Sequence, residues 1–318
     1  MIILELLGNS SHDLNLPLIE QNTSSLPLVI AVVMKYWGED IINFEGDKNH
    51  YISPNIINGI EVAEKNDFVS YFSKSTIRDL KKWIDQGIPP IVIFPGLYDL
   101  PQHALIISGY DDAEKRILTY IPQPDTTGSI PESKFSSEWN QEDNVAIILI
   151  PKDMKNLLPK DKLQVTRSYR LCFEAERDFS YGNLVYSIKK VTEAVEIDKT
   201  NAFAWSLLGS CYSETNNIEC IKCFTQAIKL NATYFLAFRG LGNFYLKTKD
   251  YQNAEKYYSK AIELNPNRYG PIYKNRAFSR LQLNRNQEAK QDLILYLEKT
   301  PNAQDREYIT EALKSLNI

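Results

Sequence analysis

The C-terminal half of the chain repeats itself, and this periodicity constrains the fold more than any other feature of its 318 residues. Alanine recurs at Ala194, Ala227 and Ala261, and Tyr296 occupies the same place in the next copy. The spacings are 33, 34 and 35 residues, the length of one pair of antiparallel helices. Large and small residues alternate within each period as stacked helix pairs require. This half therefore predicts an all-α solenoid.

The residues around these alanines resemble the signature of the tetratricopeptide repeat (TPR). The most complete copy consists of Phe238, Leu241, Gly242, Tyr245, Ala254, Tyr258, Ala261 and Pro266. Another copy keeps Trp205, Leu208, Gly209 and Tyr212. In the first copy Leu171, Ala175 and Gly182 stand in for signature residues, and the last keeps Tyr273, Ala277, Ala289 and Pro301.

The resemblance implies four helix pairs within residues 165–302, at about 167–200, 201–233, 234–267 and 268–301. Residues 303–318 then fit a capping helix that covers the exposed apolar end of the array.

Repeats of this family bind peptides or helices in a concave groove lined by the first helix of each pair. The positions that face the groove in the family are Arg239, Asn243 and Lys247 in the third copy, with Lys274 and Asn275 nearby in the fourth. Together they resemble a clamp for a carboxylate or an acidic peptide. The alternative is a solvated face that carries ordinary charges.

The N-terminal half predicts helices first and antiparallel strands afterwards, which is an α+β arrangement. Residues 25–38 are apolar on every side and predict a buried helix. Further helices are expected at 56–65 and at 75–86, the latter capped by Ser75. Strands are expected at 90–94, 104–110, 116–121 and 145–150.

The buried helix resembles the nucleophile helix of papain-like double-glycine leader peptidases, which process the leaders of exported bacteriocins. Family helices begin Cys-Gly-Pro or Cys-Leu-Pro and end in Tyr-Tyr-Gly or Tyr-Trp-Gly. Aligned on residues 36–38 (Tyr-Trp-Gly), Pro27 matches the family proline and Ser25 falls on the cysteine. The segment 102–111 resembles the family's histidine strand, and Phe135 and Trp139 fit its closing helix. The resemblance implies a papain-like N-terminal domain.

The same resemblance implies catalytic roles for four residues. Ser25, or a cysteine in its place, is the nucleophile, and His103 is the base and acid. Gln21 supplies an oxyanion donor, although its spacing to Ser25 is about one residue short of the family's. The family's orienting aspartate is absent, so Gln123 is the candidate to hold the imidazole, with Asp125 close in sequence.

Serine at position 25 leaves three interpretations open. The first is a natural loss of the catalytic cysteine, which gives a pseudo-peptidase that keeps the cleft. The second is an engineered replacement of cysteine by serine, and the third is a serine that works as the nucleophile. A hydroxyl is far less acidic than a thiol, so a site tuned for a thiolate gives it little help. Read without the family, Ser25 is only a helix cap, and a lone histidine such as His103 is more often structural than catalytic.

The four cysteines all fall in predicted helices of the C-terminal half, at Cys172, Cys211, Cys220 and Cys223. This placement favours reduced thiols over a disulfide framework. A zinc site at Cys220 and Cys223 would need two further ligands, and none is nearby, so packing is the preferred interpretation. We expect no metal or other cofactor.

A net charge of −4 gives no reason to expect nucleic acid as a partner, and no apolar run is long enough to span a membrane. We expect a cytoplasmic chain, because the first residues lack the features of a signal peptide. A secreted or periplasmic chain whose leader has been removed would look the same.

The predicted organisation is a papain-like domain at 1–152, a linker at 153–164 and the TPR solenoid after it. Two functions follow. In the first, the N-terminal cleft binds a peptide or amide, and cleaves it if position 25 is natively cysteine, while the repeats recruit the partner or substrate. In the second, the chain is a non-catalytic adaptor that brings proteins together.

Overall fold

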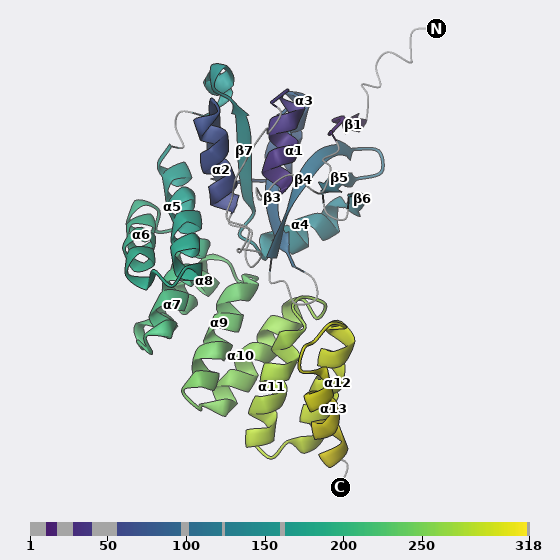
Figure 1. Cartoon of the computed structure of the whole chain (residues 1–318), viewed down its shortest axis with the longest axis vertical. Helices are drawn as coiled ribbons and strands as arrows, with labels where there is room; N and C mark the ends of the chain where they lie inside the picture. Colours follow the sequence, from purple (N-terminus) through teal and green to yellow (C-terminus); the bar gives the residue numbers. More distant parts are fainter. Residues whose placement is uncertain are drawn as a thin grey trace. The chain divides into compact units, whose positions relative to one another are not determined.

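The computed structural model describes residues 11–17, 28–39, 56–96, 102–122, 125–159 and 163–316 (Figure 1). The chain divides into two compact units. One comprises Met1–Phe94 and Ala104–Lys199, and the other comprises Pro95–His103 and Thr200–Ile318.

The first unit is built on a seven-stranded sheet in the order β2-β7-β3-β4-β5-β6, with β1 pairing β4 off this path. The strands are β1 (Ser11–Asp13), β2 (Phe68–Lys74), β3 (Ile91–Pro95), β4 (Gln102–Asp111), β5 (Arg116–Ile121), β6 (Thr126–Pro131) and β7 (Val145–Pro151). Each strand pairing for which a register is described is antiparallel. Gly109 is needed where β1 crosses β4, because a Cβ there would lie 2.0 Å from the carbonyl oxygen of His12.

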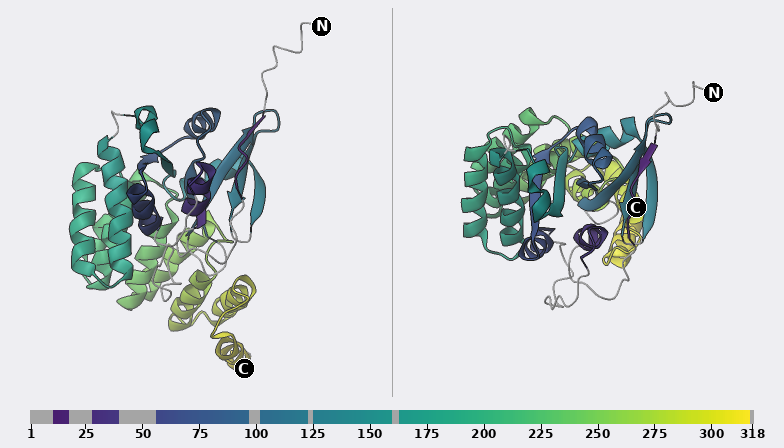
Figure 2. Two further views of the ribbon diagram at one scale, coloured as in Figure 1. Left: turned by 45° about the horizontal axis from the view of Figure 1, so that its top comes forward. Right: turned by 90° about the horizontal axis from the view of Figure 1, so that it is seen from above.

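Among the described residues, four helices and a 3-10 turn accompany the strands: α1 (Leu28–Tyr36), α2 (Ile56–Lys65), α3 (Ile77–Asp85), α4 (Glu132–Asn140) and η1 (Lys152–Leu157). Helix α1 lies against the sheet (Figure 2), and the indole Nε1 of Trp37 just after it donates to the carbonyl of Leu149 on β7 at 3.2 Å. Phe135 and Trp139 of α4 are fully buried against Phe94 and the neighbouring strands.

The α+β arrangement of the N-terminal half is confirmed, and the four predicted strands appear as β3, β4, β5 and β7. Three strands were not predicted: β1, β2 and β6. The prediction that Ser75 caps α3 is wrong. The cap is Thr76, whose side chain accepts the amide of Asp79 in a capping box, while the Ser75 hydroxyl pairs with that of Ser73.

Helices α5 (Leu163–Ser180) and α6 (Leu184–Ile197) form a helix pair that belongs to the same compact unit as the sheet. On α5, the Thr166 hydroxyl donates to the carbonyl of Phe72 at 3.0 Å, and the ring of Phe173 packs on that of Phe72. Arg170 forms two hydrogen bonds to Glu64 of α2, at 2.5 and 2.9 Å. The helix pair that the sequence assigns to the first repeat is therefore fastened to the sheet.

The second unit contains three further helix pairs and a final helix. Their bounds are α7 (Ala202–Glu214), α8 (Glu219–Leu230), α9 (Phe235–Lys247), α10 (Tyr251–Leu264), α11 (Pro271–Gln282), α12 (Asn286–Lys299) and α13 (Arg306–Ser315). These pairs coincide with the predicted second, third and fourth repeats, and a helical solenoid of TPR type in the C-terminal part is confirmed.

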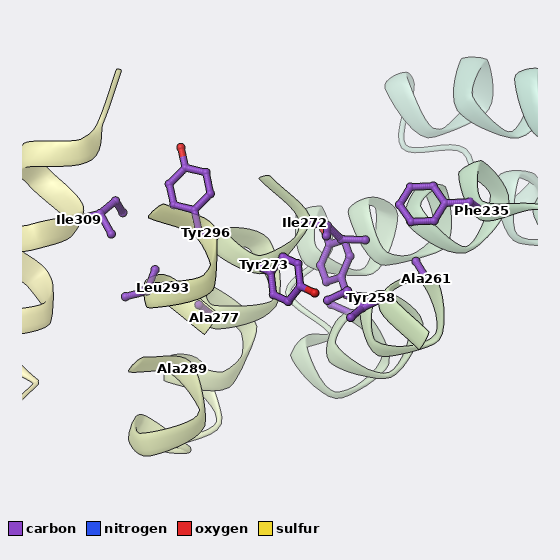
Figure 3. Packing of buried hydrophobic residues seen from close by; sticks show 12 residues of the cluster. Phe235, Tyr258, Ala261, Ile272, Tyr273, Ala277, Ala289, Leu293, Tyr296 and Ile309 are labelled. Carbon is purple, nitrogen blue, oxygen red and sulfur yellow. The ribbon is translucent and has the colours of Figure 1, made fainter. Parts of the chain in front are cut away.

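In the α7–α8 and α9–α10 pairs, a glycine on the first helix receives an aromatic ring from the second. The ring of Phe224 lies against Gly209, and the ring of Tyr258 lies against Gly242, where an added Cβ would be 2.6 Å from a ring carbon. Figure 3 shows the resulting core around Tyr258, Ala261 and Tyr273. The repeating glycines are therefore packing positions that admit an aromatic ring.

The division into compact units falls at Thr200, whereas the sequence places its linker at 153–164. The η1 turn, Lys152–Leu157, overlaps the first part of the predicted linker. The contacts of α5 with Phe72 and Glu64 explain why the first helix pair groups with the sheet.

Candidate functional site

His103 lies at the beginning of β4, where the family resemblance places a catalytic histidine. Its side chain is half-buried. Burial lowers the pKa of His103, and a hydrogen bond with the backbone of Pro95 opposes this shift only in part. The imidazole is therefore neutral at neutral pH, the state in which it can accept a proton.

The other three residues assigned to catalysis, Gln21, Ser25 and Gln123, lie outside the described residues. Their distances to His103 are not defined, so the proposed dyad stays a prediction. Asp125, the carboxylate near Gln123, accepts the hydroxyl of Tyr120 at 2.8 Å. Burial, together with this hydrogen bond, raises the pKa of Tyr120 to about 12.

The Tyr-Trp-Gly end of the family motif has a packing role. The Tyr36 hydroxyl donates to the carbonyl of Gly87 at 2.9 Å and so ties α1 to the end of α3. Trp37 contacts β7, and Gly38 ends the helix with a φ of 88°, a conformation that favours glycine. These residues hold α1 in place whether or not the site is catalytic.

Arg239, Asn243 and Lys247 lie at successive turns of α9, on one face of the first helix of its pair. The guanidinium of Arg239 stacks over the ring of Tyr269 at 4.8 Å. Its Nε atom is buried and has no hydrogen-bond partner among the described residues. The stacking fixes the plane of the Arg239 guanidinium.

The two amide side chains predicted for this face meet at one hydroxyl. Tyr258 of α10 donates to Oδ1 of Asn243 at 2.9 Å and shares a second hydrogen bond with Asn275 of α11. Burial raises the pKa of Tyr258, so its hydroxyl stays protonated. The Tyr258 hydroxyl thus connects α9, α10 and α11.

The two lysines predicted for this face have intramolecular partners. Lys247 donates to the last carbonyls of α7, those of Ser213 and Glu214, at 3.2 Å each. Lys274 pairs with Asp305 at 2.7 Å, and the Tyr296 hydroxyl donates to the same carboxylate. An acidic ligand has to compete with these partners. Sequence reasoning missed Asp305 and Tyr269, because neither belongs to the repeat signature.

The four cysteines are buried, and none of them is in a disulfide bond. Burial raises the pKa of Cys220 to about 11 and that of Cys223 to about 12, so both thiols are protonated and unreactive at neutral pH. Within the part of the chain that the structure describes, no group of three or more His, Cys, Asp or Glu side chains could hold a metal ion. In the same residues, no helix has the length and apolarity needed to cross a membrane.

Residues 235–268 match the family model of the tetratricopeptide repeat. This segment contains α9, α10 and the turn that leads to α11. No curated protein sequence matches the chain significantly.

Among solved structures, the chain is similar to PilF of Pseudomonas aeruginosa, with 17% identity, a TM-score of 0.44, and coverage of 48% of this chain and 68% of that one. It is also similar to the MamA protein, with 23% identity and a TM-score of 0.38, over 44% of this chain and 75% of that one.

Proposed function

We propose that the chain is a protein-binding scaffold whose partner docks on the first helices of the TPR-type pairs, α7, α9 and α11. One observation carries the proposal: the segment that matches the repeat family, 235–268, contains the polar face of α9 formed by Arg239, Asn243 and Lys247. Repeats of this type use that face for peptides and helices.

The side chains on the polar face of α9 indicate which chemical groups of the partner they bind. Arg239 is oriented by Tyr269, whereas Lys247 and Lys274 already bond within the chain, so Arg239 is the cation of this face best placed to take a carboxylate. Asn243 and Asn275 are fixed by Tyr258 and offer amide groups to a peptide backbone. The partner is then a segment with an acidic side chain or a C-terminal carboxylate.

The test is capture of partners by the full chain, followed by chemical crosslinking and mass spectrometry to locate them. We expect crosslinks within 201–301 that disappear in Arg239→Gln. Arg167→Gln, at an exposed arginine of α5, is the matched control and keeps them. Crosslinks confined to residues 56–159, or unchanged by Arg239→Gln, reject the proposal.

A second candidate is amide or peptide hydrolysis at a papain-like site formed by Ser25 and His103. It is supported by the family resemblance and by the lowered pKa of His103, which suits a base. We expect Ser25→Cys to react with iodoacetamide faster than the parent chain, whose four cysteines are buried. Equal labelling after the further change His103→Ala would exclude the dyad.

A further inference from the structure

Strand β2 is at the end of the strand order, and β7 is its one neighbour among the described strands. The direction of its backbone groups follows from three hydrogen bonds. On the β7 side, the carbonyl of Asp67 accepts the amide of Lys152 just after β7, and the amide of Ser75 donates to the carbonyl of Asn144 just before it. On the other side, the carbonyl of Phe72 accepts the hydroxyl of Thr166 of α5. Because alternate residues of a strand point opposite ways, Phe68 and Ser70 direct their N–H and C=O groups away from β7.

A groove of about 780 Å³ runs along this open edge. It is lined by Glu64, Phe68, Val69, Ser70, Tyr71, Lys155, Asn156, Leu158, Pro159, Thr166 and Arg170, and we call it the β2 edge groove. Its volume lies in the range of known ligand sites.

The two walls of the β2 edge groove come from opposite faces of the sheet. On one face the Ser70 hydroxyl donates to Glu64 at 2.6 Å, so α2 and α5 form that wall. On the other face Val69 and Leu158 pack against the cluster of Tyr71, so the residues around η1 form the second wall. The groove is therefore a slot that opens directly onto the backbone of β2.

We propose that the β2 edge groove binds an extended peptide segment of a partner protein, which adds to the sheet as a strand beside β2. The amides and carbonyls of Phe68 and Ser70 provide up to four backbone hydrogen bonds, the pattern by which sheet edges recognise peptides. Val69, Leu158 and Pro159 give apolar contacts to alternate side chains. This site is separate from the polar face of α9.

The charges at the β2 edge groove specify one feature of the peptide. Glu64 and Arg170 neutralise each other through paired hydrogen bonds. Lys155 is exposed, and no ion-pair partner for it lies among the described residues. The groove therefore favours a segment of alternating apolar residues with an acidic side chain at one end.

The probe is a fluorescein-labelled peptide of about six residues, the usual length of a strand. In it, valine alternates with threonine behind one glutamate. We expect saturable binding by fluorescence anisotropy to the full chain. We also expect hydrogen exchange at the Phe68 and Ser70 amides to slow about tenfold or more when the peptide is bound.

Two substitutions of Ser70 distinguish the contribution of its backbone N–H to peptide binding from the contribution of its side chain. Ser70→Pro removes the outward N–H without touching the ladder to β7, and we expect it to weaken binding about tenfold or more. Ser70→Ala loses the same hydroxyl contact to Glu64 but keeps the N–H, and we expect it to bind like the parent. Circular dichroism checks that both are folded.

A second probe keeps the test valid if Ser70→Pro does not fold. The same peptide with alternate amides N-methylated cannot form the strand pairing, and we expect it not to bind. Equal binding of both peptides, unchanged exchange at Phe68 and Ser70, or dimerisation of the chain through this edge in light scattering would overturn the proposal. None of these results bears on the partner of α9, because Arg239 is not part of the groove.

Discussion

Arg276 of α11 holds Asp292 of α12 by two parallel hydrogen bonds, Nη2 to Oδ1 at 2.7 Å and Nε to Oδ2 at 2.9 Å. Asp292 is 1% exposed, and Arg280 donates to the same carboxylate at 2.8 Å. These arginines occupy the positions that Leu241 and Tyr245 hold in the preceding pair. The last helix pair thus replaces apolar packing with a buried ionic network that also includes Glu255 of α10.

Asp292→Ala is expected to destabilise the chain by about 3–5 kcal/mol, because it leaves two arginines buried without their shared carboxylate. Urea unfolding with circular dichroism measures the change. The combined variant Arg276→Leu/Arg280→Tyr/Asp292→Ala, which restores the signature residues at positions 276 and 280, should recover most of that loss. If Asp292→Ala alone lowers the free energy of unfolding by less than about 1 kcal/mol, the network is solvated and contributes little to stability.

Gly242→Ala is expected to cost about 1–3 kcal/mol, because its Cβ would lie 2.6 Å from the Tyr258 ring. In the background of Tyr258→Leu the same change should cost less, since Ala277 and Leu293 form that combination in the next pair. A double-mutant cycle in thermal unfolding measures the coupling. If Gly242→Ala lowers the free energy of unfolding equally in both backgrounds, the Tyr258 ring is not what requires a glycine at position 242.

The repeats could be predicted in detail because their signal is local and periodic. Each pair carries its small and large partners at nearly constant spacing, as at Gly242 and Tyr258, so the sequence alone locates α7 to α12. Strand β2 gave no such signal. Its residues pack on both faces, with Phe72 against α5 and Tyr71 against Trp83, so apolar and polar residues do not alternate cleanly.

The candidate sites could be predicted only in part, for a different physical reason. Spacing along α9 places Arg239, Asn243 and Lys247 on one face, which is a property of the helix itself. Their partners Tyr269 and Ser213 come from other turns and helices. Likewise, Arg170 meets Glu64 across 106 residues of sequence. Such contacts depend on tertiary packing and have no short-range pattern.

Glu176 on α5 predicts a pH dependence of the first unit. Burial, with the nearby carboxyl of Glu142, raises the pKa of Glu176 to about 7. Because the pKa is higher in the folded state, the stability that Glu176 contributes is complete below its unfolded value and is lost as the pH rises toward 7 and above. Glu176→Gln should therefore stabilise the chain at about pH 8 relative to the parent, and the difference should shrink by about pH 5.

Urea unfolding across this pH range, followed by Trp fluorescence, measures the difference. Glu193→Gln on α6 is the control, since its carboxylate pairs with Arg167 at the surface. A constant gap between parent and Glu176→Gln at all pH values would exclude the proton linkage.

His103 is expected to give the free energy of unfolding the opposite dependence on pH from that of Glu176. Its folded pKa lies below the ordinary value of about 6.5 because the half-buried side chain is partly desolvated, so the unfolded chain binds more protons. The stability that the neutral ring contributes is present above about pH 6.5 and is lost as the pH falls through the lower folded pKa. His103→Gln should flatten this part of the stability curve.

The chain has three histidines, so NMR of the parent and the variant identifies the resonance of His103 by its loss. A midpoint at or above about 6.5 for that resonance would contradict the burial argument and would also weaken the case for a neutral base at this position.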